Sequence, residues 1–192
     1  QLHLMEKMDF HCETRLKNDR GEGIDTLYFV KEITGKGIRA YGYTIGNGKC
    51  GIRNTITDVP GVKVGHYTVR KGKKQTGVTV IIPCDGFVYE RKPLAAVYAL
   101  NGFGKTQGTV QIEELGVLET PIALTNTLNV GKAADGLVTF TEKECRKNGK
   151  ELVSVNPVVG ETNDSRINQI TERVVEAVSY THLRAHETLA NL

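Results

Sequence analysis

Short apolar stretches separated by turn residues follow one another from residue 59 onward, and they predict strands. Val62, Val64 and Tyr67 alternate with other residues, as in a half-buried strand. Residues 78–82 form a β-branched run that is typical of a buried strand. Similar runs predict further strands near Leu27, Leu94, Ile122 and Val153. The strand near Val153 is expected to cover residues 152–159.

Apolar residues at helical spacing mark three other stretches. Val110 and Leu115, followed by the stop signal Gly116, predict a short helix. A longer amphipathic helix ending near residues 148–149 is predicted from Val130, Ala133, Ala134, Leu137, Val138, Thr141 and Cys145. A last core-facing stripe is formed by Ile167, Ile170, Val174, Val175 and Val178. This order of strands and helices predicts one layered α/β domain.

Polar residues gather where two predicted strands end. The run 122–124 leads into Thr125, Asn126, Thr127 and Asn129. The run 152–159 leads into the loop GETNDSRIN, which contains Glu161, Asn163 and Asn168. A glycine-rich loop, 101–108, precedes the short helix and exposes backbone N–H groups where the helix dipole favours anionic groups. Because α/β folds keep ligands at the carboxyl ends of strands, these loops form the candidate site.

Simpler interpretations compete at three positions. The segment GFGKT is similar to a phosphate-binding loop, but that motif requires glycine at the position of Ala99. Asn126 is also suited to a turn or helix cap. His66 follows Gly65 at the expected end of the first strand, where a structural hydrogen bond is a commoner role than general base. No serine stands in a G-x-S-x-G elbow that would give His66 a nucleophile.

Composition narrows the class of protein. The net charge is +3, and basic residues do not form a stripe with interleaved aromatics, so we expect no nucleic acid partner. The run at residues 70–74 is interpreted as a solvated hairpin tip. Four cysteines without metal-binding spacing suggest reduced thiols in a cytoplasmic protein: Cys12, Cys50, Cys84 and Cys145. The sequence has no apolar run of membrane-spanning length, and no membrane partner is expected.

Both ends of the chain look atypical. It begins at Gln1 without an initiator, which suggests an open-ended fragment. Residues 179–192, SYTHLRAHETLANL, resemble translated adapter sequence, and we expect a non-native tail there. His182, His186 and Glu187 share a helical spacing that metal sites use, but their place in this tail argues against a metal. The sequence predicts no metal.

Five strings carry a family resemblance, and they occur in order between about residues 37 and 178: IRAYGYTIG, NTITDVPGVKVGHYTV, TGVTVIIP, NGFGKTQGTVQIEELGVLETPIALTNTLNVG and NPVVGETNDSRIN. They resemble the L-aminopeptidase/D-esterase (DmpA-type) family, which includes the β-peptidyl aminopeptidases. The resemblance implies a four-layer αββα sandwich, also seen in ornithine acetyltransferases and incomplete here. It divides the chain into an unassigned extension (1–36), a partial aminopeptidase domain (37–178) and the tail (179–192).

The resemblance also implies a chemistry. Family members are made as one precursor that cuts itself before a Ser or Thr, and this residue becomes the amino-terminal nucleophile of a second subunit. They hydrolyse amino-terminal residues from small peptides, amides or esters without metal or cofactor, and the complete protein is expected to be a homo-oligomer. The asparagine of the first subunit that belongs to the active site falls on Asn168, with Asn163 as the neighbouring alternative. The implied substrate-binding residues are Asn101, Lys105, Asn126 and Glu161.

Three departures from the family pattern matter. Relatives often have Asn-Asp where this chain has Asn168-Gln169, and we expect the helix that begins there to be shortened. Many relatives have Glu where this chain has Lys105, so the substrate preference does not carry over. The last glycine is Gly160, so the family's glycine-rich run and the nucleophile after it are missing from this sequence. We therefore expect this chain to lack its second subunit and to be inactive. The alternatives are an ornithine acetyltransferase-like acyltransferase and a non-enzymatic binding or assembly module.

Overall fold

The structure, a computed structural model, describes residues 11–16, 26–30, 41–44, 46–100 and 102–175. The chain divides into two compact units, residues 1–54 and 55–192. In the first unit, β1 (His11–Leu16) pairs antiparallel with β2 (Thr26–Val30), which confirms the strand predicted near Leu27. The predicted boundary at residue 36 and the predicted tail lie outside the described residues.

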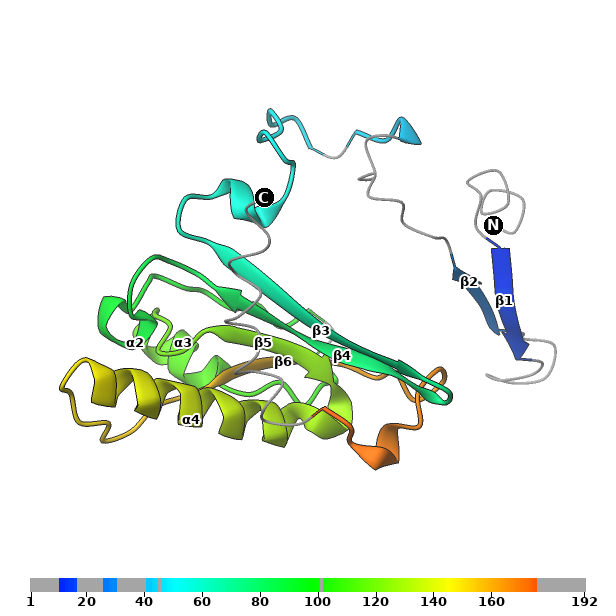
Figure 1. Cartoon of the computed structure of the whole chain (residues 1–192). Coiled ribbons are helices and arrows are strands. Elements are labelled where there is room, and N and C mark those ends of the chain that lie inside the picture. Colours follow the sequence, from blue (N-terminus) through cyan, green and yellow to red (C-terminus); the bar gives the residue numbers. More distant parts are fainter. Residues whose placement is uncertain (1–10, 17–25, 31–40, 45, 101, 176–192) are drawn as a thin grey trace. The chain divides into compact units, whose positions relative to one another are not determined.

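The second unit contains a sheet in the order β3-β4-β5-β6 (Figure 1). Its strands are β3 (Lys63–Lys71), β4 (Lys74–Ile82), β5 (Ile122–Asn126) and β6 (Val158–Thr162). The first three strands are antiparallel, and β6 is parallel to β5. Its helices are α2 (Val88–Arg91), α3 (Thr109–Leu115) and α4 (Val130–Lys147), with short 3-10 turns η2 (Ile56–Asp58), η3 (Thr127–Asn129) and η4 (Ile170–Glu172).

The β3–β4 hairpin extends past the rest of the sheet. Lys71 pairs with Lys74, so only Gly72 and Lys73 connect the strands, and Gly72 has a φ of +58° that a side chain would disfavour. β5 pairs with β4 only over residues 78–81, and the hairpin therefore projects beyond it. The basic run at residues 70–74 lies at the tip of this hairpin, as predicted.

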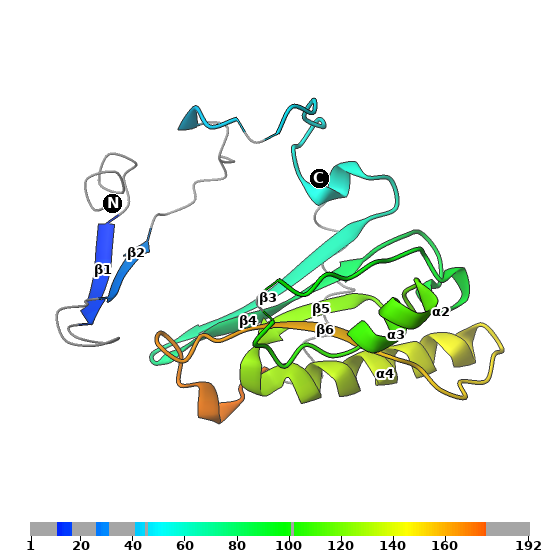
Figure 2. The ribbon, with the colours of Figure 1, turned by 180° about the vertical axis from the view of Figure 1, so that it is seen from behind.

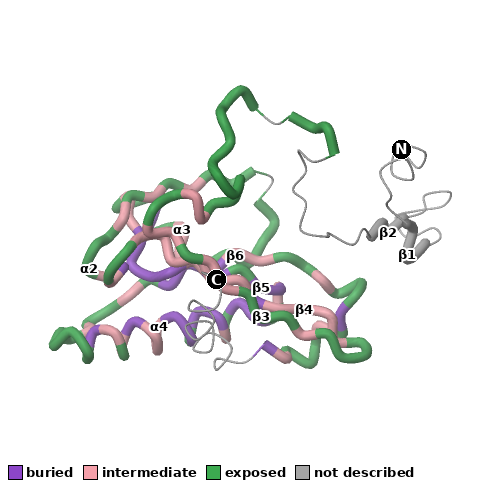
Figure 3. The backbone as a smooth tube through the Cα atoms, turned by 45° about the horizontal axis from the view of Figure 1, so that its top comes forward, coloured by how far each residue is buried: buried purple, intermediate pink, exposed green. Residues whose placement is uncertain are grey.

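Helix α4 covers one face of the sheet. Its apolar residues pack against alternate residues of the strands to form the main core: Val78, Ala123, Val130, Ala133, Ala134, Leu137, Val159 and Val175. Figure 3 shows the buried positions recurring along α4. Gly149 follows the helix with a φ of +64°, which confirms the predicted end. Burying Leu137 contributes about 2–3 kcal/mol by removing its side chain from water.

A second, smaller core closes part of the opposite face. Helices α2 and α3 lie together at one end of the sheet in both views (Figures 1 and 2). The residues that cluster there are Val88, Ile112, Leu118 and Val158, with Ile122 partly buried beside them. Gly108 precedes α3 with a φ of +86°, and a Cβ there would lie 2.4 Å from the Pro157 carbonyl oxygen, so this close approach requires glycine. The predicted short helix and its Gly116 stop are confirmed.

Two strand predictions were wrong. Near Leu94 the structure has only an isolated bridge to Val117, because the Ala95 N–H donates to the Gly116 carbonyl (2.8 Å) and not to the main sheet. The predicted strand 152–159 begins only at Val158.

The later start has a local cause. Pro157 has no N–H for a ladder, and the Asn156 N–H donates to the Glu119 carboxylate (2.9 Å). The backbone before β6 is therefore bonded to a side chain, and the apolar run 152–155 lies outside the sheet.

The last predicted helix was also wrong in the described residues. Its stripe contains only the short turn η4, and Arg173 follows in the left-handed region with a φ of +48°. The Gln169 N–H donates to the Lys73 carbonyl (2.8 Å), so this segment bonds to the β3–β4 hairpin in place of forming helical bonds. Val175 still reaches the main core, whereas Ile167 is exposed. Val178 lies outside the described residues.

Candidate active site

A groove of about 440 Å³ lies on the sheet face opposite α4. Val80 and Ala123 pair across the strands and belong to the α4 core, so the adjacent pair, Thr79 and Leu124, points to the other face and lines the groove. Gly160 stands opposite Leu124 in β6, and a Cβ there would lie 2.9 Å from the Leu124 Cδ2. The groove continues to Asn126 at the end of β5 and to Asp164 after β6, close to where the sequence places the candidate site.

Asn168 is held from two sides beside this groove. Its Oδ1 accepts from the Gln75 N–H (3.1 Å), and its Nδ2 donates to the Asp164 Oδ1 (3.1 Å). Only 5% of the residue is exposed. The Gln75 bond fixes which end of the carboxamide is the oxygen, and it therefore fixes the direction of the NH2 group. Gln75 and Asp164 both line the groove.

Asn163 is placed differently. It is exposed, and its Oδ1 accepts from the Ser165 N–H (3.0 Å), as in an Asx turn. The structure therefore separates the two candidate asparagines: Asn163 caps its own turn, and Asn168 connects the loop to the β3–β4 hairpin.

Glu161 joins β6 to the glycine-rich loop. Its Oε1 accepts from the Lys105 N–H (3.2 Å), and its Oε2 accepts from the Thr127 hydroxyl. Lys105 is exposed, and its Nζ lies 5.0 Å from the centre of the Phe103 ring. The backbone of the loop and the side chain of Glu161 are thus brought together, while the Lys105 ammonium lies over an aromatic face. Asn101 lies outside the described residues.

Asn126 is buried, and its carboxamide has partners within the chain. Its Nδ2 donates to the Thr76 Oγ1 (2.7 Å), and its Oδ1 accepts from both the N–H (3.1 Å) and the Nδ2 (2.9 Å) of Asn129. The simpler interpretation of Asn126 as a capping residue is confirmed, because it caps η3. Its predicted contact with substrate stays a prediction.

His66 lies within β3 and not at its end. Its Nδ1 is 2.8 Å from the Thr79 Oγ1, its cross-strand partner in the register. This arrangement confirms the structural hydrogen bond that sequence reasoning preferred. The ring lines the groove, but in the described residues no carboxylate bonds its other nitrogen, so His66 and Thr79 lack the third member of a catalytic triad.

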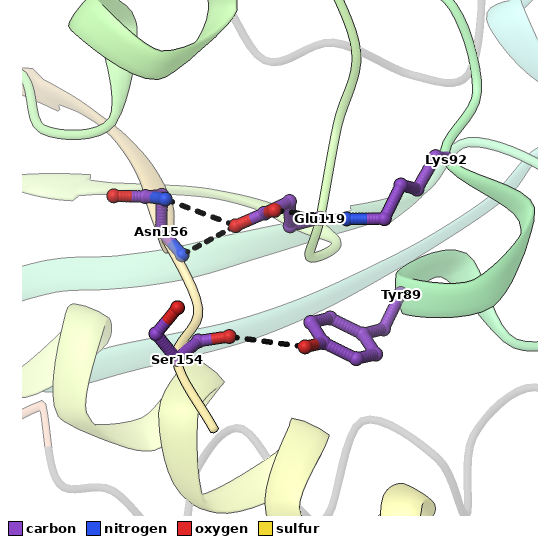
Figure 4. Close-up of polar contacts among 5 residues, drawn as sticks. All are labelled: Tyr89, Lys92, Glu119, Ser154 and Asn156. Carbon is purple, nitrogen blue, oxygen red and sulfur yellow. Dashed lines mark hydrogen bonds and ion pairs between the residues drawn. The ribbon is translucent and has the colours of Figure 1, made fainter. Parts of the chain in front are cut away.

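A buried carboxylate that sequence reasoning missed lies at the other end of the sheet (Figure 4). Glu119, 8% exposed, accepts from the Lys92 Nζ (2.9 Å) and from the N–H (2.9 Å) and Nδ2 (3.0 Å) of Asn156. Beside it, the Tyr89 hydroxyl donates to the Ser154 carbonyl oxygen (3.1 Å). These contacts hold the irregular segment before β6. No pattern marks Glu119, because its partners are distant in the sequence.

The hydrogen bonds at Glu119 also set its charge. Burial raises the pKa of the carboxyl group, but the bonds from Lys92 and Asn156, with the positive charge of Lys92, outweigh burial and hold the pKa below its usual value. Glu119 is therefore a structural anion. Burial raises the pKa of the Cys145 thiol, which makes that side chain a poor nucleophile at neutral pH.

Metal-ligand clusters and membrane-spanning helices are absent from the described residues. Within them, no three His, Cys, Asp or Glu side chains are grouped as metal ligands. The helices in the same residues are too short or too polar to cross a lipid bilayer.

Comparisons with known proteins agree with this fold. The model of peptidase family S58 matches residues 54–190. The β-peptidyl aminopeptidase BapA of Sphingosinicella xenopeptidilytica is 36% identical over 138 residues, which is 64% of this chain and 32% of that protein. The chain thus spans about a third of the length of this curated relative.

Two solved structures are also similar. The β-aminopeptidase of a Burkholderia species has a TM-score of 0.68 at 42% identity, covering 77% of this chain and 42% of that one. The L-aminopeptidase D-Ala-esterase/amidase of Ochrobactrum anthropi, described as a variant of the Ntn hydrolase fold, has a TM-score of 0.64 at 29% identity, covering 73% and 42%. The resemblance to DmpA-type proteins and the predicted αββα fold class, present here in part, are confirmed. The chain belongs to peptidase family S58, a family of aminopeptidases.

Proposed function

We propose that this chain supplies the first-subunit part of a self-processing aminopeptidase that removes amino-terminal residues from small peptides, amides or esters. The observation that carries the proposal is the S58 match over residues 54–190, joined to a buried, oriented asparagine beside a groove in the matched region. The chain spans only part of its relatives, so the activity proposed is that of the complete protein.

The proposed reaction divides the chemistry between two parts of the protein. A Ser or Thr at the amino terminus of the second subunit attacks the substrate carbonyl, and its own α-amine takes the hydroxyl proton. The carbonyl oxygen becomes an oxyanion, which the Nδ2 of Asn168 stabilises. The amine or alcohol leaves with a proton, and water then hydrolyses the acyl-enzyme.

The surroundings of Asn168 support its assignment over Asn163. A carboxamide whose oxygen is already bonded to the Gln75 N–H presents its NH2 group in a fixed direction, and such a group stabilises developing charge without reorganising. Asn163 uses its oxygen for a local turn and is exposed. A group free to move in water contributes less to a transition state.

We propose that the substrate binds in the groove. Its volume of about 440 Å³ suits a small ligand, and its lining combines apolar Leu124 with polar Thr79 and Thr162. We place the substrate at the end of the groove near the glycine-rich loop, with Lys105 and Asn126 at its margin. The Lys105 N–H bonds Glu161, which lines the groove, so we expect the Lys105 cation to disfavour substrates with a second positive charge.

The second subunit is the proposed partner that covers the open sheet face. Three apolar side chains that line the groove are exposed: Tyr67 at 43%, Leu124 at 43% and Ile167 at 55%. Exposed apolar surface of this kind is typical of an interface. We therefore expect the 192-residue chain alone to be inactive and the complete protein to be a homo-oligomer.

The test is to express the uninterrupted S58 gene product beside the 192-residue chain. The complete protein should appear as two subunits and hydrolyse an aminoacyl p-nitroanilide, while the short chain should neither cut itself nor turn over. Activity of the short chain alone contradicts the proposed division of the site. Transfer of acetyl groups to ornithine, without hydrolysis, would assign the protein to the acyltransferase alternative.

A further inference from the structure

We propose that Glu161 is a positioning residue that holds the glycine-rich loop in place, and that it is not a ligand for the substrate's ammonium group. This inference deepens the proposed function and rests on it for the role of the loop. The hydrogen bonds on which the inference is based lie within this chain and do not depend on the proposed activity.

The loop and β6 run antiparallel, and backbone bonds join them at one point. The Gln107 N–H donates to the Val159 carbonyl (2.9 Å), and the Val159 N–H donates to the Gln107 carbonyl (3.1 Å). In this antiparallel register, Lys105, two residues before Gln107, would lie opposite Glu161, two residues after Val159. Among the described residues, no backbone hydrogen bond joins Lys105 and Glu161. The Lys105 N–H donates instead to the Oε1 of the Glu161 side chain (3.2 Å). The side chain therefore replaces the missing backbone hydrogen bond.

Gly104 allows the carboxylate to reach this position. A Cβ at Gly104 would lie 3.1 Å from the Glu161 Oε1, closer than most real contacts. The φ of Gly104 is not in the left-handed region, so glycine serves here to leave space and not to permit a turn. The sequence Gly-Lys at 104–105 thus fits a carboxylate against the loop backbone.

The other carboxylate oxygen is also engaged. The Glu161 Oε2 accepts from the hydroxyl of Thr127, the first residue of η3. Glu161 itself belongs to β6 and pairs with Thr125 of β5, so its backbone is fixed by the sheet. One side chain therefore ties the loop to both strand ends that border the groove.

The partners of Glu161 among the described residues are neutral donors, a backbone N–H and a hydroxyl. We call these two contacts of the Glu161 side chain the loop clamp. The clamp depends on where the hydrogen-bonding atoms of residue 161 lie, whereas a ligand for an ammonium group depends on its negative charge. Glutamine keeps an oxygen for Lys105 and places an NH2 group where it donates to the Thr127 Oγ1. Aspartate keeps the charge but is one methylene too short. The two variants therefore distinguish the two roles.

The first experiment measures opening of the loop in the 192-residue chain. Trypsin cleavage after Lys105 is followed by mass spectrometry, with cleavage after exposed Lys49 in the other unit as the internal reference. Glu161→Ala should accelerate cleavage after Lys105 about tenfold, because two hydrogen bonds that oppose local opening are lost. Glu161→Gln should stay within about twofold of the parent, and Glu161→Asp should approach the alanine variant.

Two further variants keep this result interpretable. Thr127→Val removes the hydroxyl with little change in shape, and it should accelerate cleavage by about threefold, because it breaks one of the two bonds. Glu114→Ala removes an exposed carboxylate from nearby α3, and it should have no effect. If the Glu161→Gln chain is cut as fast as the alanine variant, or if neither differs from the parent, the clamp is wrong.

The second experiment uses the complete protein and an aminoacyl p-nitroanilide. Glu161→Ala should lower kcat/KM by about tenfold or more, and Glu161→Gln should restore it to within about threefold. If the glutamine variant is as impaired as alanine, with the loss in KM, while aspartate is active, Glu161 binds the ammonium and the positioning role is wrong. If the complete protein hydrolyses no such substrate, the proposed function fails, and the proteolysis result alone decides the clamp.

Discussion

The two faces of the sheet are built from the same strands but have different properties. The face toward α4 is apolar and closed: Val78, Ala123 and Val159 lie in one core with Leu137. In the described residues the opposite face is closed at the α2–α3 end, and elsewhere it forms an open groove of mixed polar and apolar lining in which Leu124 is 43% exposed. Because side chains alternate along a strand, the register that buries one set of side chains against α4 directs the alternate set into the groove. The closed face forms the main core, and the open face carries the candidate site.

Two carboxylates that bond irregular segments of the chain repeat this contrast. Glu119 is buried and paired with a lysine, and it holds the segment before β6 at the closed end. Glu161 bonds neutral donors at the groove end. Both side chains attach an irregular segment to the sheet. Because Glu119 lies at the closed end and Glu161 beside the groove, we expect substitution of Glu119 to affect mainly stability and substitution of Glu161 to affect mainly turnover.

The largest expected effect is on the closed face. Leu137→Ala should lower the free energy of unfolding by about 3 kcal/mol, because it removes a side chain that is 2% exposed and leaves a cavity under α4. Urea unfolding of the 192-residue chain measures it. Leu124→Ala on the groove face is the matched control and should cost less than about 1 kcal/mol. Equal losses would contradict the distinction between the faces.

The next effect is on turnover. In the complete protein, Asn168→Ala should lower turnover about a hundredfold, equivalent to about 2.7 kcal/mol of barrier, the usual size for losing one oxyanion donor. Initial rates with an aminoacyl p-nitroanilide measure it. Asn163→Ala removes a similar side chain from the exposed turn and should stay within about threefold of the parent. An Asn168→Ala protein as active as the parent would remove Asn168 from the reaction.

A smaller effect is expected at the buried carboxylate. Glu119→Ala should cost about 2 kcal/mol in unfolding free energy, because the Asn156 N–H and the Lys92 ammonium lose their acceptor. Because Lys92 is partly exposed, water can solvate its ammonium group in the variant, and this limits the loss of stability. Exposed Glu114→Ala should change stability by less than about 0.5 kcal/mol. A large fall in turnover by the folded Glu119→Ala form of the complete protein would show that this end also serves the site.

The smallest expected effect is on acid stability. The pKa of Glu119 is lowered in the folded chain, so its stabilising contribution is present above the usual carboxyl pKa of about 4.3 and is lost as pH falls through the lower folded value. Urea midpoints of the parent and Glu119→Gln between pH 7 and pH 3 measure this. The parent should lose more stability than the variant over that interval. Parallel curves would contradict the lowered pKa.

Local pattern predicted much of the fold. The α4 stripe, the β-branched run in β4 and the Gly116 stop all describe neighbours within one element, and the structure confirms them. The runs near Leu94 and Val153 have the same local signal but lie outside the sheet. An apolar run does not show whether its backbone N–H and C=O groups can form hydrogen bonds with a neighbouring strand. Pro157 and the side-chain bond to Asn156 decided that question.

The sequence by itself identified the candidate site residues: a polar loop with Asn168 after one strand and glycines before a short helix. Only the tertiary structure decided their partners. Asn168 bonds Gln75 across 93 residues, and Glu161 bonds Lys105 across 56. Periodicity reports on residues a few positions apart, whereas these contacts form only after the sheet has brought distant segments together, because closing long loops costs entropy that the assembled core offsets.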